Sequence, residues 1–389
     1  MDRLKFVEKK EDEIIKLLTQ LVKIPSQNGI DDEREIAEFV VKFLRKFDFR
    51  PELVGDKRRP SISCHIGNRN SKKTLWFDAP LDTVVIGDSK RWSSPPFSAE
   101  IRKGKLYGRG SADCKAGIAC FIYTAIALFR VGKPPNGQLI LTFDADEQSG
   151  NGSGIKEILT KGVRANALII GYPGSDEISI GGRGVLRFEV EVIGTPVHTG
   201  ARFRQGVNAI TKMVKFIEAF EKLNLPHKKD RFFQFGPKIT VSQIQGGEAI
   251  NMTPSSCKIN VDVRLLPSQD KDLVVKSVEN ILRDLRKKDP EFRAQASFYQ
   301  FCPAFLTDPK EKIVKTLQKN AQEILKRRVE IVASGGFSIG NIVSQKMKLP
   351  IISGFGVDFE NVHGYDECIY VDSLVPVTQT YIKTAMDFF

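Results

Sequence analysis

The sequence has little of what marks several classes of protein. Its six cysteines include no CxxC pair and no regular spacing, which predicts free thiols in a reducing compartment. No apolar stretch is expected to cross a membrane, and no apolar signal-peptide core follows the charged start MDRLKFVEKK. No zinc-finger or RNA-binding signature is present. We therefore expect a cytoplasmic protein that contacts neither membrane nor nucleic acid.

Positive charge is in excess but is not concentrated. The chain has 59 Lys and Arg against 47 Asp and Glu, which gives a net charge of +12. The cations are dispersed and often stand beside acids on helical stretches such as KDLVVKSVENILRDLRKKD. This pattern indicates a solvated surface and leaves a preference for an anionic ligand open.

Length and periodicity predict two domains. In the first part, strand patterns such as GQLILTF alternate with helical patterns such as KAGIACFIYTAIALFRVG, which predicts an α/β fold with a mainly parallel sheet. Near residue 178 the order becomes strand, helix, two strands, helix and strand, which is typical of a ferredoxin-like α+β domain. We predict an α/β domain from 1–177 and 302–389, with residues 178–301 inserted into it.

Acidic residues gather where the predicted strands end. The side chains at these ends are Asp82, Asp146, Glu147 and Tyr172. Because the ends of parallel strands meet at one edge of a sheet, these groups should lie close together. Neighbouring carboxylates need a metal ion, a Lys or Arg partner, or a proton. Asp113, in the glycine-rich GRGSADCKAG, and His363, in ENVHGYDE, are candidate ligands for a metal.

Several motifs follow one another over nearly the whole chain. In order they are LDTV (81–84), RWSSPPFSAEIRKGKLYGRGSADCKAG (91–117), DEQSGNGSG (146–154), GGRGVLRFEVEVIGTPVHTG (181–200), INMTP with VDVRLLP (250–267) and VHGYDE (362–367). Together they resemble the M20 family of metal-dependent amidohydrolases and peptidases, such as acetylornithine deacetylase and succinyl-diaminopimelate desuccinylase. The resemblance implies a zinc-exopeptidase-like catalytic domain and an inserted lid domain through which two copies form a homodimer.

The resemblance also implies roles for individual residues. Glu147 corresponds to the catalytic general base and Asp82 to the acid that orients the first zinc ligand. His198 corresponds to the lid histidine that polarises the scissile carbonyl. Asp113 corresponds to the ligand that bridges two zinc ions, and His363 to the last zinc ligand.

The substrate-facing positions of the family are also matched. Asn251 and Arg264 correspond to lid residues that face the substrate or its carboxylate, and the fork of an arginine suits a carboxylate. Tyr172 lies at the same cleft and is a further candidate for contact with the ligand. These matches imply a small molecule or peptide that carries a carboxylate.

Three of the five positions for zinc ligands are changed. Pro80 stands in place of a histidine and has no donor atom, and Gln148 replaces a glutamate by a neutral amide. Tyr172 replaces an acid before a proline, and the reference pKa of its phenol, about 10, opposes binding as phenolate. We expect a zinc site that is reduced or absent, with one divalent metal at most. Such a single-metal site could use Asp113 and His363 with Asp146.

Three hypotheses follow. The first is an amidohydrolase or deacylase that acts on an N-acyl amino acid or small peptide with a rearranged metal site. The second is a non-catalytic relative that binds a carboxylated ligand in the old cleft. The third is metal-independent acid–base chemistry by Glu147, Asp82, Tyr172 and His363.

Overall fold

A computed structural model describes residues 2–203 and 205–389, and the chain divides into two compact units. Unit 1 consists of Met1–Gly182 with Leu306–Phe389, and unit 2 of Arg183–Phe305. Strand β8 (Glu177–Gly182) pairs in parallel with β14 (Glu330–Ser334) and so belongs to unit 1. The predicted boundaries after residues 177 and 301 therefore fall a few residues too early.

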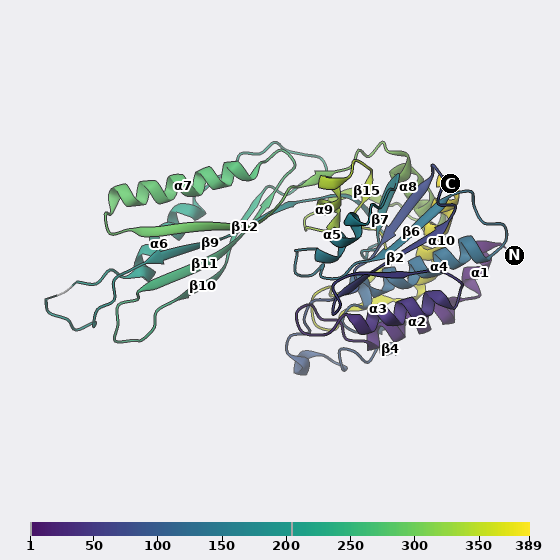
Figure 1. Ribbon diagram of the computed structural model, residues 1–389, viewed down its shortest axis with the longest axis horizontal. Coiled ribbons are helices and arrows are strands. Elements are labelled where there is room, and N and C mark those ends of the chain that lie inside the picture. Colours follow the sequence, from purple (N-terminus) through teal and green to yellow (C-terminus); the bar gives the residue numbers. More distant parts are fainter. Residues whose placement is uncertain (1, 204) are drawn as a thin grey trace. The chain divides into compact units, whose positions relative to one another are not determined.

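The centre of unit 1 is a six-stranded sheet (Figure 1). Its strands, in order across the sheet, are β1 (Glu52–Gly55), β2 (Pro60–Gly67), β6 (Gln138–Phe143), β3 (Thr74–Asp78), β7 (Ala167–Ile170) and β15 (Ile351–Ile352). The pairs from β6 to β15 are parallel, and those on the β1 side are antiparallel. The prediction of a mainly parallel α/β sheet is confirmed. Every residue of β3, β6 and β7 is buried, as in a sheet that is covered on both faces.

Helices surround this sheet. They are α1 (Arg3–Glu8), α2 (Glu11–Lys23), α3 (Arg34–Arg45), α4 (Ala116–Arg130), α5 (Ser153–Thr160), α8 (Lys312–Leu325), α9 (Ile339–Lys346) and α10 (Leu374–Phe388). Helix α4 packs against α1, α2 and α10, whereas α5 packs against α9, β1 and β2. The segment Ser111–Arg130 is long and apolar enough to cross a membrane, which the sequence analysis did not anticipate, but all of it except Arg130 is buried in the core of unit 1.

Two small sheets complete unit 1. One contains β13 (Phe305–Leu306), β8 and β14. The other contains β16 (Phe359–Glu360), β17 (Cys368–Tyr370), β5 (Lys105–Tyr107) and β4 (Ile101–Arg102), all antiparallel. The pairing of β5 with β17 brings together two loops that are about 250 residues apart in the chain.

Unit 2 has the predicted order of strand, helix, two strands, helix and strand. Its elements are β9 (Gly184–Ile193), α6 (Ala209–Glu221), β10 (Lys238–Gly246), β11 (Ser256–Leu265), α7 (Lys271–Lys288) and β12 (Arg293–Cys302). The sheet is antiparallel with the order β10–β11–β9–β12. Alternate residues of β9 and β11 are buried with the apolar faces of α6 and α7, which form the core of this unit.

The six cysteines are all buried and form no disulfide. This agrees with the free thiols that their spacing predicts.

Candidate functional site

The carboxyl ends of β3, β6 and β7 meet at one edge of the central sheet. The segments that leave these ends carry Asp82, the pair Asp146 and Glu147, and Tyr172. Their meeting follows from the parallel pairing of the three strands. The predicted grouping at the strand ends is therefore found in the structure, although the groups divide into separate hydrogen-bonded sets.

Glu147 and Tyr172 form the first of these sets. The Tyr172 hydroxyl donates to Oε1 of Glu147 at 2.6 Å. Burial raises the pKa of Glu147 well above its ordinary value, and the charges of Asp113 and Asp82 raise it further. Burial, together with the Glu147 carboxyl, raises the pKa of Tyr172 well above 10. Tyr172 therefore keeps its proton and acts here as a hydrogen-bond donor.

Asp113 and His363 form the second set, with Gln148. Nε2 of His363 lies 2.7 Å from Oδ2 of Asp113, and the Gln148 amide donates to the same oxygen at 3.3 Å. The hydrogen bond with Asp113 raises the pKa of His363, although half of the His363 side chain is exposed. Gln148 thus presents its amide nitrogen to Asp113, which is the reverse of what a metal ligand would do.

Asp82 holds the loop after β6. One of its oxygens accepts from the backbone N–H of Glu147 at 3.0 Å and the other from that of Gln148 at 2.9 Å. The Asn28 amide donates to Asp82 at 2.8 Å. Burial raises the pKa of Asp82 to about 6, and these three donors limit the rise. With no histidine at position 80 to orient, the Asp82 carboxylate positions the backbone beside Glu147.

Pro80 is accommodated because its neighbours continue the pairing of β3 with β6. Ala79 N–H donates to the Thr142 carbonyl at 3.3 Å and Leu81 N–H to the Asp144 carbonyl at 2.8 Å. The residue between them faces away from β6, so a proline there breaks no bond to that strand.

Asp146 is held by partners other than Asp113 and His363. Its oxygens accept from Arg59 at 2.9 Å, from Ser153 at 2.6 Å and from Asn28 at 3.1 Å. Burial alone would raise its pKa, but these donors outweigh burial and lower it. In this arrangement the Asp146 carboxylate is engaged by Arg59, Ser153 and Asn28, and a single-metal site that uses it stays a prediction.

Beneath these groups lies a layer of buried acids that the sequence analysis did not assign to the site. Asp78 accepts from the Thr142 hydroxyl, and burial raises its pKa to about 7. Asp144 is fully buried, and neither of its oxygens has a donor among the described residues. Glu33, at the start of α3, accepts from Asp146 N–H, and burial raises its pKa to about 8. In the sequence, Asp144 is marked by the density of acids in DADE and Asp78 by its place at the end of the apolar strand WFD, whereas Glu33 has no such signal.

The predicted residues of unit 2 lie on two parts of that unit. His198 and Asn251 are exposed on adjacent loops, where Thr199 N–H donates to the Asn251 carbonyl at 3.0 Å. Nδ1 of His198 accepts from Gly200 N–H at 3.0 Å. Arg264 directs its fork at Asp262, with Nε at 2.6 Å and Nη2 at 3.3 Å. A carboxylate of a ligand would have to compete with Asp262 for Arg264.

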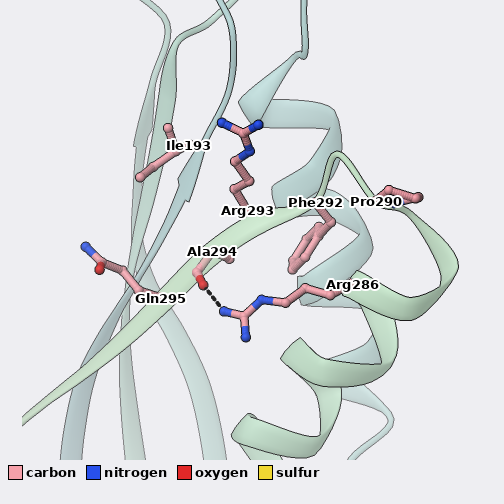
Figure 2. A pocket seen from close by; sticks show the side chains of 7 residues that line it. All are labelled: Ile193, Arg286, Pro290, Phe292, Arg293, Ala294 and Gln295. Carbon is pink, nitrogen blue, oxygen red and sulfur yellow. Dashed lines mark hydrogen bonds between the residues drawn. The ribbon is translucent and has the colours of Figure 1, made fainter.

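Unit 2 also has two shallow hollows. The first, of about 550 Å³, lies beside the loops of His198 and Asn251 and is lined by Thr199 and by 246–250, among others. The second, of about 390 Å³, lies where α7 ends and β12 begins (Figure 2). There Arg286 donates to the Ala294 carbonyl, so one of its nitrogens is already occupied. Neither hollow is lined by any of the acids at the strand ends.

In residues 2–203 and 205–389, no group of three or more His, Cys, Asp and Glu side chains is placed to hold a metal ion. Asp113 and His363, the two predicted metal ligands, contact each other directly.

Comparison with known proteins identifies the family of the chain. Residues 76–387 match the sequence profile of peptidase family M20/M25/M40. The chain belongs to this family. The M20 resemblance of the sequence motifs is thus confirmed, and with it descent from hydrolases of amide bonds.

Relatives of known name in the M20 family are distant but aligned from end to end. Succinyl-diaminopimelate desuccinylase 2 of Ruegeria sp. is 27% identical over 386 residues, with 96% of this chain and 95% of the relative covered. An uncharacterized metallohydrolase of Methanocaldococcus jannaschii is 26% identical, with 96% and 98% covered.

Solved structures confirm the fold. An M20 metallo-carboxypeptidase of Sulfolobus solfataricus superposes with a TM-score of 0.82 at 18% identity, with 97% of this chain and 99% of that one covered. A dinuclear metal-binding M20 peptidase of Bacillus subtilis gives a TM-score of 0.74 at 15% identity, with 98% of both chains covered. The zinc-exopeptidase-like architecture with an inserted α+β domain is therefore shared with metal-dependent members of the family.

Proposed function

We propose that this M20 family member binds an N-acyl amino acid or small peptide but does not carry out the two-zinc hydrolysis typical of its family. One observation carries the proposal. At the three replaced ligand positions, Pro80 has no atom that can bind a metal. Gln148 and Tyr172 instead donate hydrogen bonds within the protein, to Asp113 and Glu147.

The remaining side chains do not fit a dinuclear zinc centre. Catalytic zinc usually has three protein ligands with a water. Of the family ligands only Asp113 and His363 remain, and two zinc ions would bring four positive charges to a single ligand carboxylate. The protonated Tyr172 hydroxyl and the Gln148 amide instead supply hydrogen bonds to the acids that zinc would otherwise neutralise.

The chemistry of the ligand is inferred from the relatives. Those named succinyl-diaminopimelate desuccinylase act, by their name, on a succinylated amino acid that carries carboxylates. By the resemblance of their motifs, His198, Asn251 and Arg264 correspond to positions that face such ligands in the family. We infer a ligand of the same class, whose carboxylate competes with Asp262 for the guanidinium of Arg264.

A second candidate function is acid–base chemistry without a metal. It is favoured by the 2.6 Å hydrogen bond between the Tyr172 hydroxyl and Glu147, which joins two proton-carrying groups at the strand ends. Such a pair can donate or accept a proton at a bound ligand. Replacement of Tyr172 by phenylalanine would abolish this activity but leave ligand binding in place.

The test combines metal analysis, binding and turnover. Protein purified without chelator is analysed for zinc, cobalt and manganese, and N-succinyl and N-acetyl amino acids are tested for thermal shift and for hydrolysis, with and without added zinc. We expect less than one metal ion per chain, a positive thermal shift and no hydrolysis. Stoichiometric zinc with efficient hydrolysis would refute the proposal.

A matched set of variants tests the assignment of the ligand positions. The triple change Pro80→His, Gln148→Glu and Tyr172→Glu restores the family ligand types and should produce tight zinc binding. The same triple variant with Asp113→Asn should lose that zinc. If the triple variant binds no more zinc than the unchanged protein, the assignment of these positions is wrong.

We also propose a homodimer formed through unit 2. Strand β10 is an edge strand in which no residue is fully buried, and Ile244, Ile250 and Met252 on and beside it are exposed. An exposed edge with apolar side chains favours pairing with another chain. Light scattering should give twice the chain mass, and Ile244→Lys should give a monomer. Because its six cysteines form no disulfide, we expect the dimer in the reducing cytoplasm.

A further inference from the structure

Two loops bring Asp113 and His363 into contact, and both leave the same pair of strands. The loop with Asp113 follows β5, and the loop with His363 precedes β17. These strands pair directly, with Tyr107 opposite Cys368, and Gly108 N–H donates to the Glu367 carbonyl at 2.9 Å. The pairing brings the two loops near each other, but it leaves the positions of the side chains at their tips undetermined.

A buried ion pair connects the tips of these loops. Arg109, on the first loop, donates to Glu367, at the end of the second, and their side chains are only 2% and 1% exposed. The second oxygen of Glu367 accepts from the backbone N–H groups of Ala112 at 3.0 Å and of Asp113 at 3.2 Å. Glu367 therefore holds the backbone of Asp113 directly.

The same pair holds the backbone beside His363. Nη2 of Arg109 donates to the Gly364 carbonyl at 3.0 Å. One residue of each loop thus contacts the backbone of the other loop, and the two residues contact each other. Arg109 and Glu367 thus link the backbones of the two loops that carry Asp113 and His363, whose side chains lie 2.7 Å apart.

The loop with His363 needs such support because its backbone is strained. Asn361, His363 and Asp366 have φ values of +56°, +63° and +56°. Side chains other than glycine rarely adopt this region, and they persist there only where surrounding contacts enforce it. The bond from Arg109 to Gly364 lies at the centre of this strained segment.

A role in stability alone explains this pair poorly. Buried ion pairs commonly contribute little more than apolar side chains of similar size, because both charges lose their water. Here one oxygen of Glu367 accepts from the backbone of Ala112 and Asp113, and one nitrogen of Arg109 donates to the backbone of Gly364, next to His363.

We propose that Arg109 and Glu367 are positioning residues, which set the contact between Asp113 and His363 by fixing the backbones of their two loops. Neither residue touches a ligand, and both act through their neighbours. The proposal holds whether the site binds a ligand only or also carries out chemistry, since it concerns the contact itself.

The contact can be observed by nitrogen NMR of the histidine rings at one fixed pH. The chain has four histidines, so protein labelled with ¹⁵N-histidine gives few ring signals, and His363→Gln identifies those of His363. In the unchanged protein the Nε2 signal of His363 should differ from that of the exposed His198. In Glu367→Gln, which keeps the shape but removes the charge, the signal should move at least halfway towards that of His198.

Two further variants separate positioning from general destabilisation. Val40→Ala removes a methyl pair from the buried face of α3 and serves as a destabilised control, which should leave the His363 signal in place. Arg109→Lys keeps a charge beside Glu367 but lacks the forked second donor for Gly364, and should move the signal part of the way.

Either variant can overturn the proposal. It is wrong if the His363 signal of folded Glu367→Gln moves no further than that of Val40→Ala while thermal stability falls. If Glu367→Gln does not fold, an unmoved His363 signal in Arg109→Lys overturns it equally. Because no ligand or metal is added, failure here would leave the proposed binding function untouched.

Discussion

Replacing Asp78 by asparagine should make the stability of unit 1 less dependent on pH. Asp78 and Asp144 are fully buried next to each other at the ends of β3 and β6. Burial raises the pKa of Asp78 from 3.8 to about 7. Burial, and after it the charge of Asp78, raises the pKa of Asp144 well above its ordinary value. One or both of these acids therefore carry a proton in the folded protein near neutral pH.

The sign and size of the effect follow from these pKa values. Between pH 3.8 and about 7 the folded protein keeps a proton on Asp78 that the unfolded chain has released. The stabilisation is complete below pH 3.8 and is lost as the pH rises through about 7. Each pKa unit corresponds to about 1.4 kcal/mol, so Asp78 lowers the free energy of unfolding by about 4 kcal/mol across this range.

Asparagine at position 78 removes this dependence and keeps the local bonds. Its amide oxygen can still accept from Thr142, and its amide nitrogen can donate to the neighbouring Asp144 in place of the protonated carboxyl. Between pH 5 and pH 8 the free energy of unfolding of the variant should therefore rise by about 3 kcal/mol relative to that of the unchanged protein.

Urea unfolding at pH 5, 6, 7 and 8 provides the measurement. Trp76, whose indole donates to Thr142 at 2.6 Å, is buried beside Asp78 and reports the unfolding of unit 1 by fluorescence. Asp284→Asn, on the exposed face of α7, is the matched control, and its free energy of unfolding should vary with pH as that of the unchanged protein does. If the free energy of unfolding of Asp78→Asn also varies with pH in this way, the reasoning about a buried, protonated Asp78 fails.

Three further predictions concern other parts of the molecule. Tyr172→Phe removes a hydrogen bond to the buried Glu147 and should lower the free energy of unfolding by about 1–3 kcal/mol in urea titrations at pH 7; an unchanged midpoint would mean that the bond is not formed. Arg59→Gln removes an ion pair that helps to lower the pKa of Asp146, and the stability that this pair contributes is lost as the pH falls. Thermal melts should therefore show a loss of less than about 1 kcal/mol in the free energy of unfolding at pH 6, and a smaller loss at pH 3. Phe188→Ala leaves a cavity in the core of unit 2 and should lower the free energy of unfolding of that unit by about 3–5 kcal/mol. Hydrogen exchange should become faster in unit 2, while the unfolding transition reported by Trp76 in unit 1 stays unchanged. Equal changes in both units would contradict the expectation that they unfold separately.

Local patterns in the sequence predicted most of the elements, and the differences arise where distant segments pair. The apolar run KAGIACFIYTAIALFRVG predicted α4, and the strand and helix patterns after residue 178 predicted the elements of unit 2, β11 among them. The place of β8 in unit 1 depends on its pairing with β14, about 150 residues later, which no local pattern carries.

The site shows the same division. The order of the motifs identified Asp82 and Glu147, which lie at the strand ends, and Asp113 and His363, which lie on two other loops. The Gln148 amide joins Asp113 to the loop that carries Glu147. It did not identify Asn28 and Arg59, which bind Asp82 and Asp146 from the chain before β3. Such partners depend on long-range folding, and an amide or a guanidinium on an ordinary surface loop has no distinguishing pattern in sequence. For the same reason the partners of Asp146, a possible member of a single-metal site, could not be predicted from the sequence.

The three replaced ligand positions have a consequence for how this chain can change over generations. Pro80 continues the run of β3, Gln148 binds Asp113 and Tyr172 binds Glu147, so each substituted residue now fits its surroundings. Reversal of any one of them would disturb a formed arrangement, while a zinc ion requires several ligands at once. Under the proposed function no single reversal restores a full set of zinc ligands, so a descendant of this chain would regain the metal only through several simultaneous changes.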